Sequence, residues 1–253
     1  PAEVIVGDLK TWEGRVDHIG DPKIDPMTVD FPAAKLLGDR QLKFLNAWSK
    51  DWTGAEMKCV LSQTVLANAA HYHGGEGNFV VADMDSNGWP QTGRNNALKE
   101  IRRGYAFMLC GDQHLATVLH HGVDEFKDSG WSFCVPSIIN FYNRWWRPQT
   151  KAVKPLDRKA ILANLGSYLD GFTNKITIYA YANPGQNPKI SNHKCAERAA
   201  GHGIVRFDKN KRTITMECWP RGVDVTKPNA PQFPGWPITI TQQDNYGRTA
   251  KAW

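Results

Sequence analysis

Hydrophobic residues in the first part of the chain fall into alternating strand-like and helix-like patterns. Short apolar runs predict strands over residues 3–6, 57–61, 105–110 and 131–139. Helices are predicted over residues 39–52 and 95–103. The first of these has one apolar face, built from Leu42, Leu45, Trp48 and Trp52 at spacings of three and four. The alternation of strands and helices predicts an α/β sheet with layered helices in residues 1–150.

Beyond residue 150 the pattern becomes strand-rich. A helix is predicted over residues 157–169, although Gly166 interrupts it, and residues 175–181 alternate as a strand does. The strongest local pattern is a β-hairpin, with strands over residues 203–207 and 212–219. Prolines and glycines then predict a loop, which ends at a last strand over residues 238–240. We expect residues 151–253 to continue the same domain.

Composition and charge narrow the function classes only moderately. The chain has 253 residues, of which 41% are hydrophobic and 22% charged, as in ordinary globular proteins. No apolar run approaches the roughly 20 residues of a membrane span, so no membrane partner is expected. The net charge of +6 is compatible with phosphorylated ligands, but no run of five basic residues occurs. Nucleic acid is therefore expected only as a substrate. No motif assigns a cellular location, and export after folding is compatible with the chain.

The cysteines favour buried thiols over a disulfide framework. Their number is odd, and no pair has the C-x-x-C spacing. Four of the five lie inside apolar, strand-like runs, where reduced thiols behave as small hydrophobic residues. The cysteines are Cys59, Cys110, Cys134, Cys195 and Cys218.

The turn after the strand over residues 105–110 is the main candidate for chemistry. It begins at Gly111 and presents Asp112 and His114 two positions apart. Ligands of α/β sheets bind beyond the carboxyl ends of strands, and a carboxylate with an imidazole suits Zn, Fe or Mn. Alternatively, Asp112 starts an ordinary turn and His114 is a surface or core histidine.

Other histidines are weaker candidates. His71 and His73 lie two apart in a glycine-rich stretch, where they could contact a metal or phosphate, but such a pair is more often a solvated loop. His120 and His121 follow an apolar stretch. Adjacent side chains of a strand point to opposite faces, so these two are not expected to reach one ion.

A third group combines two carboxylates with an arginine. Asp83 and Asp85 would suit a metal, and Arg94 a bidentate contact with phosphate. The alternative is a polar loop in which Arg94 starts the next helix. A serine hydrolase is disfavoured because no G-x-S-x-G sequence occurs, and the glycine patterns of P-loop and Rossmann proteins are missing too.

Three blocks taken together resemble the alkaline phosphatase D family of calcineurin-like metallophosphoesterases. Residues 36–45 resemble the family's "LG-x-x-Q-x-x-x-L" helix start, and residues 58–64 the strand that follows it. Residues 85–89, Arg94 and the turn at residues 111–114 follow its "D-x-W … R … GD-x-H" order. The likeness continues to residue 221 and covers most of the chain.

This resemblance implies the C-terminal portion of a four-layer α/β/β/α fold that hydrolyses phosphate mono- or diesters with two metal ions (Fe, Zn, Mn or Ca). It implies that Asp112 and His114 are metal ligands, and that Arg94, His71 and His73 line the phosphate pocket. The family's other ligand motifs, D-x-H, GD-x-x-[DY] and G-N-H-[DE], do not occur here. We therefore expect a missing N-terminal segment or a second chain to supply further metal ligands.

The alternative function is a non-catalytic, aromatic-rich binding module or subunit for a glycan or a partner protein. The chain contains ten tryptophans, and exposed indole rings form stacking platforms for sugars. The candidates are Trp145, Trp146, Trp236 and Trp253. The competing interpretation is that most tryptophans fill the core.

Overall fold

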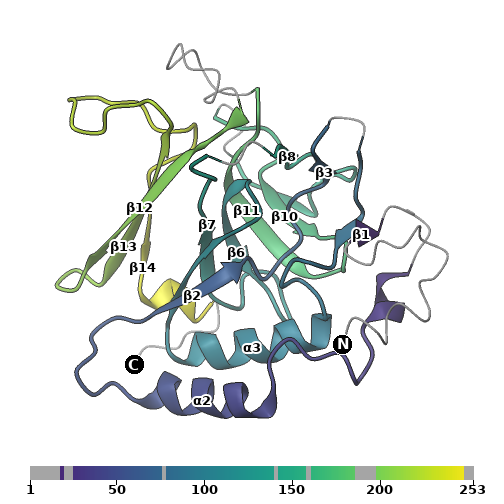
Figure 1. The fold of residues 1–253 in the computed structure, drawn as a ribbon. Helices are drawn as coiled ribbons and strands as arrows, with labels where there is room; N and C mark the ends of the chain where they lie inside the picture. The colour runs from purple at the N-terminus through teal and green to yellow at the C-terminus, as the bar shows by residue number, and fades with distance from the viewer. Residues whose placement is uncertain are drawn as a thin grey trace.

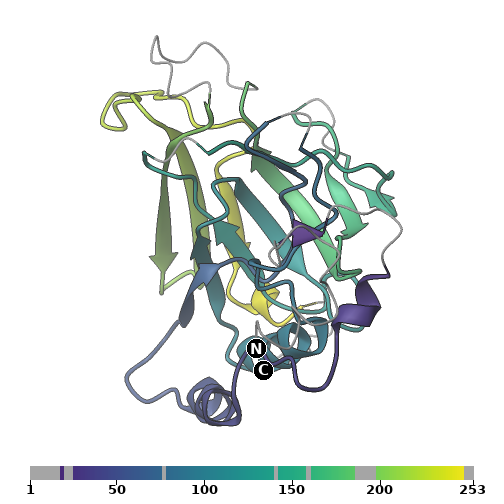
Figure 2. The same ribbon diagram turned by 45° about the vertical axis from the view of Figure 1, so that its right-hand side comes forward.

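A seven-stranded sheet lies at the centre of the structure (Figures 1 and 2). This computed structural model describes residues 18–19, 25–75, 78–139, 142–157, 161–185 and 198–247. The strand order is β2-β5-β7-β6-β11-β10-β9. The bounds are β2 Cys59–Thr64, β5 Phe107–Gly111, β6 Ala116–His121, β7 Trp131–Cys134, β9 Lys154–Pro155, β10 Gly166–Leu169 and β11 Lys175–Ala182. With its large sheet and few helices, the fold is mixed α/β, as predicted.

Strand direction changes within this sheet. Strands β2, β5 and β7 are parallel, whereas β6 pairs antiparallel with β7, and β11, β10 and β9 continue the antiparallel part. Because β7 lies between β5 and β6, the connection at residues 112–115 crosses the end of β7. The predicted Asp112–His114 turn is therefore at the carboxyl edge of the parallel strands.

Two helices lie side by side at one end of the sheet (Figure 1). Helix α2 (Asp39–Lys50) confirms the first helix prediction, and α3 (Gln91–Arg103) starts four residues before the second one. The earlier start of α3 follows from Asp30, whose carboxylate accepts hydrogen bonds from the Thr92 backbone N–H and hydroxyl in the first turn.

A smaller antiparallel sheet packs against the large one. It contains β12 (Gly201–Asp208), β13 (Thr213–Pro220) and β14 (Ile238–Thr241), which confirms both the hairpin and the last strand. Alternate residues of β13 are buried and join the same hydrophobic core as β5 and β7. A side chain at Gly203 would lie 2.7 Å from the Phe133 ring, so the two sheets approach closely here.

Four short strands form two ladders beside the large sheet. Strand β1 (His18–Ile19) pairs with β4 (Ala82–Asp83), and β3 (Tyr72–His73) pairs with β8 (Arg144–Trp145). Two 3-10 turns, η1 (Pro26–Val29) and η3 (Gln243–Asn245), complete the described elements. The register places His73 opposite Arg144, which matters for the candidate site.

Several sequence predictions need correction. The helix over residues 157–169 is wrong within the described part, because residues 166–169 form β10. Strand β7 ends at Cys134 rather than at residue 139. Strand β2 is an edge strand of the described sheet, although an apolar run predicted it, and Leu61 is 77% exposed. The bounds of β6 were not predicted, although its last two residues, His120 and His121, were expected to be neighbours on a strand. The strand predicted over residues 3–6 lies outside the described residues.

The described cysteines are free thiols, as predicted. Cys110, Cys134 and Cys218 are buried and Cys59 is half-buried, whereas Cys195 lies outside the described residues. Burial raises the pKa of Cys59 to about 11 and that of Cys134 to about 12, so both are protonated at neutral pH. Among the described residues, no helix is long and apolar enough to cross a bilayer.

Candidate functional site

The bend formed by residues 112–114 is held in an unusual backbone conformation. Asp112 and His114 have positive φ angles of 63° and 53°. Residues other than glycine rarely adopt this backbone region. Between them, the Gln113 backbone N–H donates to the Gly111 carbonyl at 2.7 Å. Strained residues of this kind persist where the surrounding structure holds them, and they concentrate at functional sites.

The two predicted ligands differ in their contacts. The ring of His114 is half-buried, and its Nδ1 lies 3.1 Å from the carbonyl oxygen of Tyr142. A carbonyl only accepts, so Nδ1 donates to it, and Nε2 is the ring nitrogen left for another partner. Histidine ligands of metals are oriented by this kind of contact. The carboxylate of Asp112 is exposed and has no hydrogen bond or ion pair with the described residues.

Asp112 and His114 alone do not make a complete metal centre. In the part of the chain that the structure describes, no group of three or more His, Cys, Asp or Glu side chains is arranged to hold a metal ion. A dinuclear site needs more ligands than one carboxylate and one imidazole. The two-ion centre implied by the family resemblance is therefore not formed by the described residues alone.

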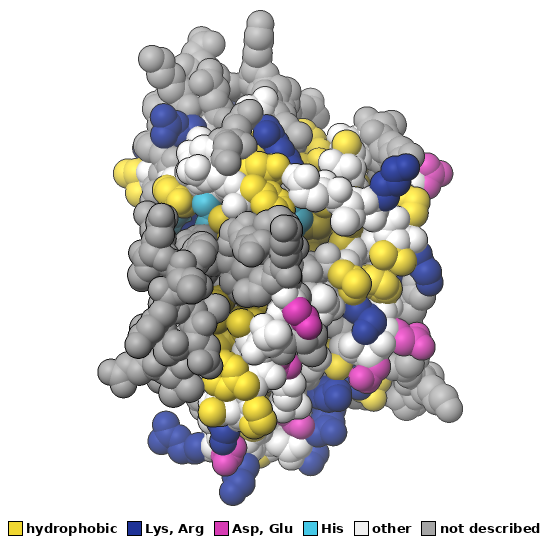
Figure 3. Space-filling view, turned by 90° about the vertical axis from the view of Figure 1, so that its right-hand side faces the viewer, with side chains coloured by type: hydrophobic (Ala, Val, Ile, Leu, Met, Phe, Trp, Pro, Cys, Tyr) yellow, Lys and Arg dark blue, Asp and Glu magenta, His cyan; other side chains and the backbone are white. Residues whose placement is uncertain are grey.

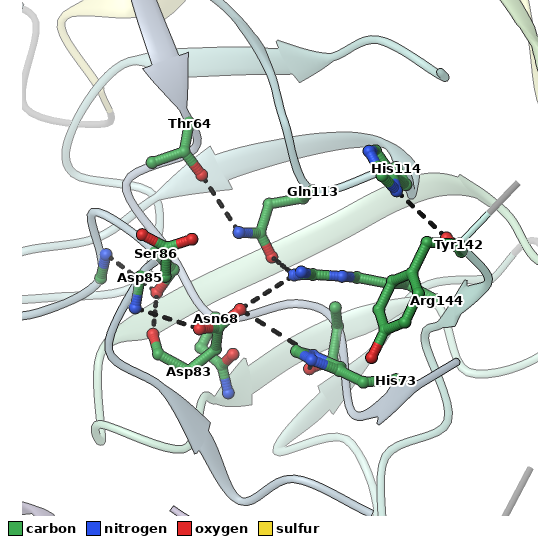
Figure 4. A network of polar contacts seen from close by, with 12 residues as sticks. Thr64, Asn68, His73, Asp83, Asp85, Ser86, Gln113, His114, Tyr142 and Arg144 are labelled. Atoms are coloured by element: carbon green, nitrogen blue, oxygen red, sulfur yellow. Dashed lines mark hydrogen bonds and ion pairs between the residues drawn. The ribbon is translucent and has the colours of Figure 1, made fainter. Parts of the chain in front are cut away.

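A chain of buried polar contacts lies directly behind the bend (Figure 4). The Gln113 side chain is 2% exposed, and its amide donates to Thr64 Oγ1 at 3.2 Å. Its carbonyl accepts a hydrogen bond from Arg144 Nη1 at 3.1 Å. The same nitrogen donates to Asp83 Oδ2 at 2.9 Å, and Asp83 is fully buried. His73 Nε2 lies 3.9 Å from this carboxylate.

His73 thus lies in the network behind the bend, whereas His71 is used for packing. His73 is 2% exposed, and its Nε2 is 3.3 Å from the Ala70 carbonyl. The ring of His71 packs on that of Trp146, with centroids 4.8 Å apart. Burial lowers the pKa of His71 to about 4, so its ring is neutral at pH 7. The structure therefore links His73 to Gln113 through Asp83 and Arg144.

Arg94 does not present its guanidinium group to a phosphate. It is 1% exposed, and it donates to the carbonyls of Leu66 at 2.9 Å and Gly122 at 2.7 Å. Gly122 follows the far end of β6, five residues beyond Thr117, which is about 16 Å along a strand. Thr117 lies opposite Cys134, at the edge that carries the bend. In this structure the Arg94 guanidinium group is therefore held among buried backbone carbonyls, away from the bend.

The adjacent histidines of β6 also have separate partners. His120 Nε2 lies 2.7 Å from the Ser129 carbonyl, and its ring stacks on Trp131. His121 Nε2 lies 3.0 Å from the Ser132 hydroxyl. As expected for neighbours on a strand, the two rings have different surroundings.

Arg144 and Gln113 are the residues that sequence reasoning missed. Gln113 occupied the variable position of the GD-x-H pattern, and Arg144 lies in an aromatic segment without a recognisable motif. Asp83 was considered as a metal ligand, but its carboxylate is engaged by Arg144 and by the Asp85 backbone N–H at 3.0 Å. The long-range β3–β8 pairing, which no local pattern shows, places Arg144 opposite His73.

The tryptophans proposed as stacking platforms are mostly internal. Trp145, Trp146 and Trp236 are 4%, 1% and 8% exposed, and Trp253 lies outside the described residues. Figure 3 shows the side of the molecule that carries β3 and β8. In the upper half of this view, histidine side chains are bordered by hydrophobic ones. The three buried indole rings fill the core rather than offering a surface for sugars.

Comparison with known proteins gives one partial structural likeness. No protein-family model matches the chain, and no curated protein matches it significantly. Among solved structures, the chain is similar to one described as "Structure of PhoD", with a TM-score of 0.45 and 18% sequence identity. The match covers 83% of this chain and 34% of that chain, so this chain spans about a third of the length of the structure it matches.

Proposed function

We propose that this chain is the C-terminal part of a metal-dependent phosphoesterase that hydrolyses phosphate mono- or diesters. Asp112 and His114 supply two metal ligands, and a further segment or a second chain supplies the others and completes a four-layer α/β/β/α core. The observation that carries the proposal is the orientation of His114: its Nδ1 is engaged by the Tyr142 carbonyl, beside a carboxylate without a partner in the described structure.

The roles of the chain's own residues follow from this geometry. The exposed Asp112 carboxylate binds a cation through oxygen, and His114 binds through Nε2, because Nδ1 is committed to Tyr142. A bound divalent or trivalent ion polarises a phosphoryl oxygen and makes water a stronger nucleophile at neutral pH. We assign no phosphate contact to Arg94 or His71, since their side chains are buried in other contacts.

The test is hydrolysis of an aryl phosphodiester by the full-length gene product loaded with Mn, Fe or Ca. We expect activity and bound metal, counted by elemental analysis, to fall together in His114→Ala and after chelation. The matched control is His202→Ala, because His202 lies on β12 in the other sheet. If His114→Ala retains the control's rate and metal content, the assignment is wrong.

A further inference from the structure

We propose that Arg144 and Gln113 are positioning residues that lock the Asp112–His114 bend into its metal-binding shape. The inference rests on the proposed function, since it assigns the support of the same ligands. Its evidence is independent, because it comes from contacts behind the bend and not from the ligand side chains.

The bend is held at two points by one short segment. The Tyr142 carbonyl accepts a hydrogen bond from the ring of His114 at 3.1 Å. Two residues later, Arg144 donates to the side chain of Gln113 at 3.1 Å. Figure 4 shows these two contacts on neighbouring residues of the bend. A shift of residues 142–144 would therefore move both the His114 ring and the backbone between the two ligands.

The segment is itself anchored to the protein interior. Arg144 pairs with His73 across the β3–β8 ladder, and the Gly74 backbone N–H donates to the Asn143 carbonyl at 2.7 Å. The guanidinium group of Arg144 is fixed by Asp83, a carboxylate with no exposed surface. A charged pair at this depth strongly favours a single geometry, because separating the partners leaves a buried charge.

Gln113 converts this anchor into a constraint on the bend. Arginine is only a donor, so the Gln113 carbonyl must face Arg144, and its amide then faces the Thr64 hydroxyl. Thr64 ends β2, so the side chain of Gln113 is held from both sides while its neighbours keep positive φ angles. Without these contacts the bend is free to relax to an ordinary turn, which would separate the two ligands.

The test variant is Gln113→Leu, which removes both side-chain contacts and leaves the Arg144–Asp83 pair intact. In the full-length protein we expect Mn²⁺ affinity, measured by competition with a fluorescent chelator, to fall about 10- to 100-fold, as when other supports of metal ligands are removed. In the metal-free protein we expect faster hydrogen exchange over residues 111–115. The matched control is Gln149→Leu, since the Gln149 amide bonds the Tyr72 hydroxyl at an exposed position.

The outcomes separate this inference from the proposed function. If His114→Ala loses metal but Gln113→Leu keeps the control's affinity and exchange rates, the positioning role is wrong and the metal site stands. If His114→Ala keeps its metal, the proposed function fails, and hydrogen exchange alone decides whether Gln113 holds the bend. Should Gln113→Leu not fold, Asp83→Asn combined with Arg144→Met removes the anchor without leaving a buried charge, and the same two measurements apply.

Discussion

Arg144 Nη1 lies 2.9 Å from Asp83 Oδ2 and joins two segments that are 61 residues apart in the sequence. The carboxylate has no exposed surface, and the side chain of Arg144 is 12% exposed. A buried pair of this kind adds little stability compared with a well-packed apolar pair, but the loss of one partner is costly. The pair therefore specifies how the β3–β8 ladder lies against the rest of the chain.

We expect Arg144→Ala to reduce the free energy of unfolding by about 3–5 kcal/mol, because it leaves the Asp83 carboxylate buried without its partner. Urea denaturation followed by circular dichroism measures this change. Arg206→Ala is the control, since Arg206 pairs with Glu217 at the surface and its loss should change stability little. A comparable loss in both variants would contradict the buried-pair argument.

Stability should decrease with acidification because of His71. Its pKa is about 4 in the folded state, against 6.5 for the free side chain, with burial as the main cause. Below pH 6.5 the unfolded chain therefore binds a proton that the folded chain excludes until about pH 4. At roughly 1.4 kcal/mol per pH unit, this window corresponds to about 3 kcal/mol of lost stability.

The variant His71→Phe keeps a ring against Trp146 and removes the titrating group. Urea midpoints measured from pH 7 to pH 4 should fall less steeply for this variant than for the wild type. His202→Phe is the matched control for the loss of a histidine. An unchanged slope in His71→Phe would show that another group causes the acid sensitivity.

The predictable part of this fold is the part in which local pattern and tertiary environment agree. The hairpin of β12 and β13 alternates buried and exposed residues, and α2 begins where the apolar spacing predicts a helix start. The helix prediction over residues 157–169 failed because Leu162, Leu165 and Leu169 recur at helical spacing. There, pairing with β9 and β11 overrides the periodicity.

The candidate site shows the same division. Asp112 and His114 can be selected from sequence, because an apolar strand and a glycine precede them directly. Their support cannot, since Arg144 reaches Gln113 only through chain reversals that no local pattern encodes. The burial of Arg94 cannot be read from sequence either, because an arginine at this spacing has the same sequence signature whether it binds phosphate or donates to buried carbonyls.

Gly166, the first residue of β10, gives a direct stability prediction. Its φ angle is 143°, and a Cβ atom at this position would lie 2.6 Å from the Lys154 carbonyl of β9. We expect Gly166→Ala to destabilise the protein by about 1–3 kcal/mol, because β9 would have to move away. The control is Gly75→Ala, whose Cβ would lie 3.7 Å from the nearest atom, the Asn78 amide nitrogen. Equal thermal midpoints for the two variants would contradict this account.

Leu61 on the edge strand β2 should tolerate a polar side chain. It is 77% exposed, so little burial is lost in Leu61→Lys, and we expect stability to change by no more than about 0.5 kcal/mol. A charge on an edge strand also opposes edge-to-edge pairing, so self-association measured by light scattering should not increase. Val118→Lys on the buried strand β6 is the contrasting variant and should not fold. A large loss of stability in Leu61→Lys would mean that β2 is covered in solution.

A substitution of Arg94 can distinguish a structural role of this residue from a phosphate-binding role. Replacing it with methionine leaves the carbonyls of Leu66 and Gly122 buried without donors, which should cost about 3 kcal/mol. Below the variant's unfolding temperature, we expect KM for an aryl phosphodiester to stay within about twofold of the wild-type value. A lost phosphate contact would instead raise KM about tenfold for each 1.4 kcal/mol of lost binding free energy. Arg103→Met on the same helix is the control, because Arg103 pairs with Glu100 near the surface. A large rise in KM with unchanged stability would show that Arg94 binds phosphate. Residues 94 and 112 would then have to approach each other in a different conformation of the chain.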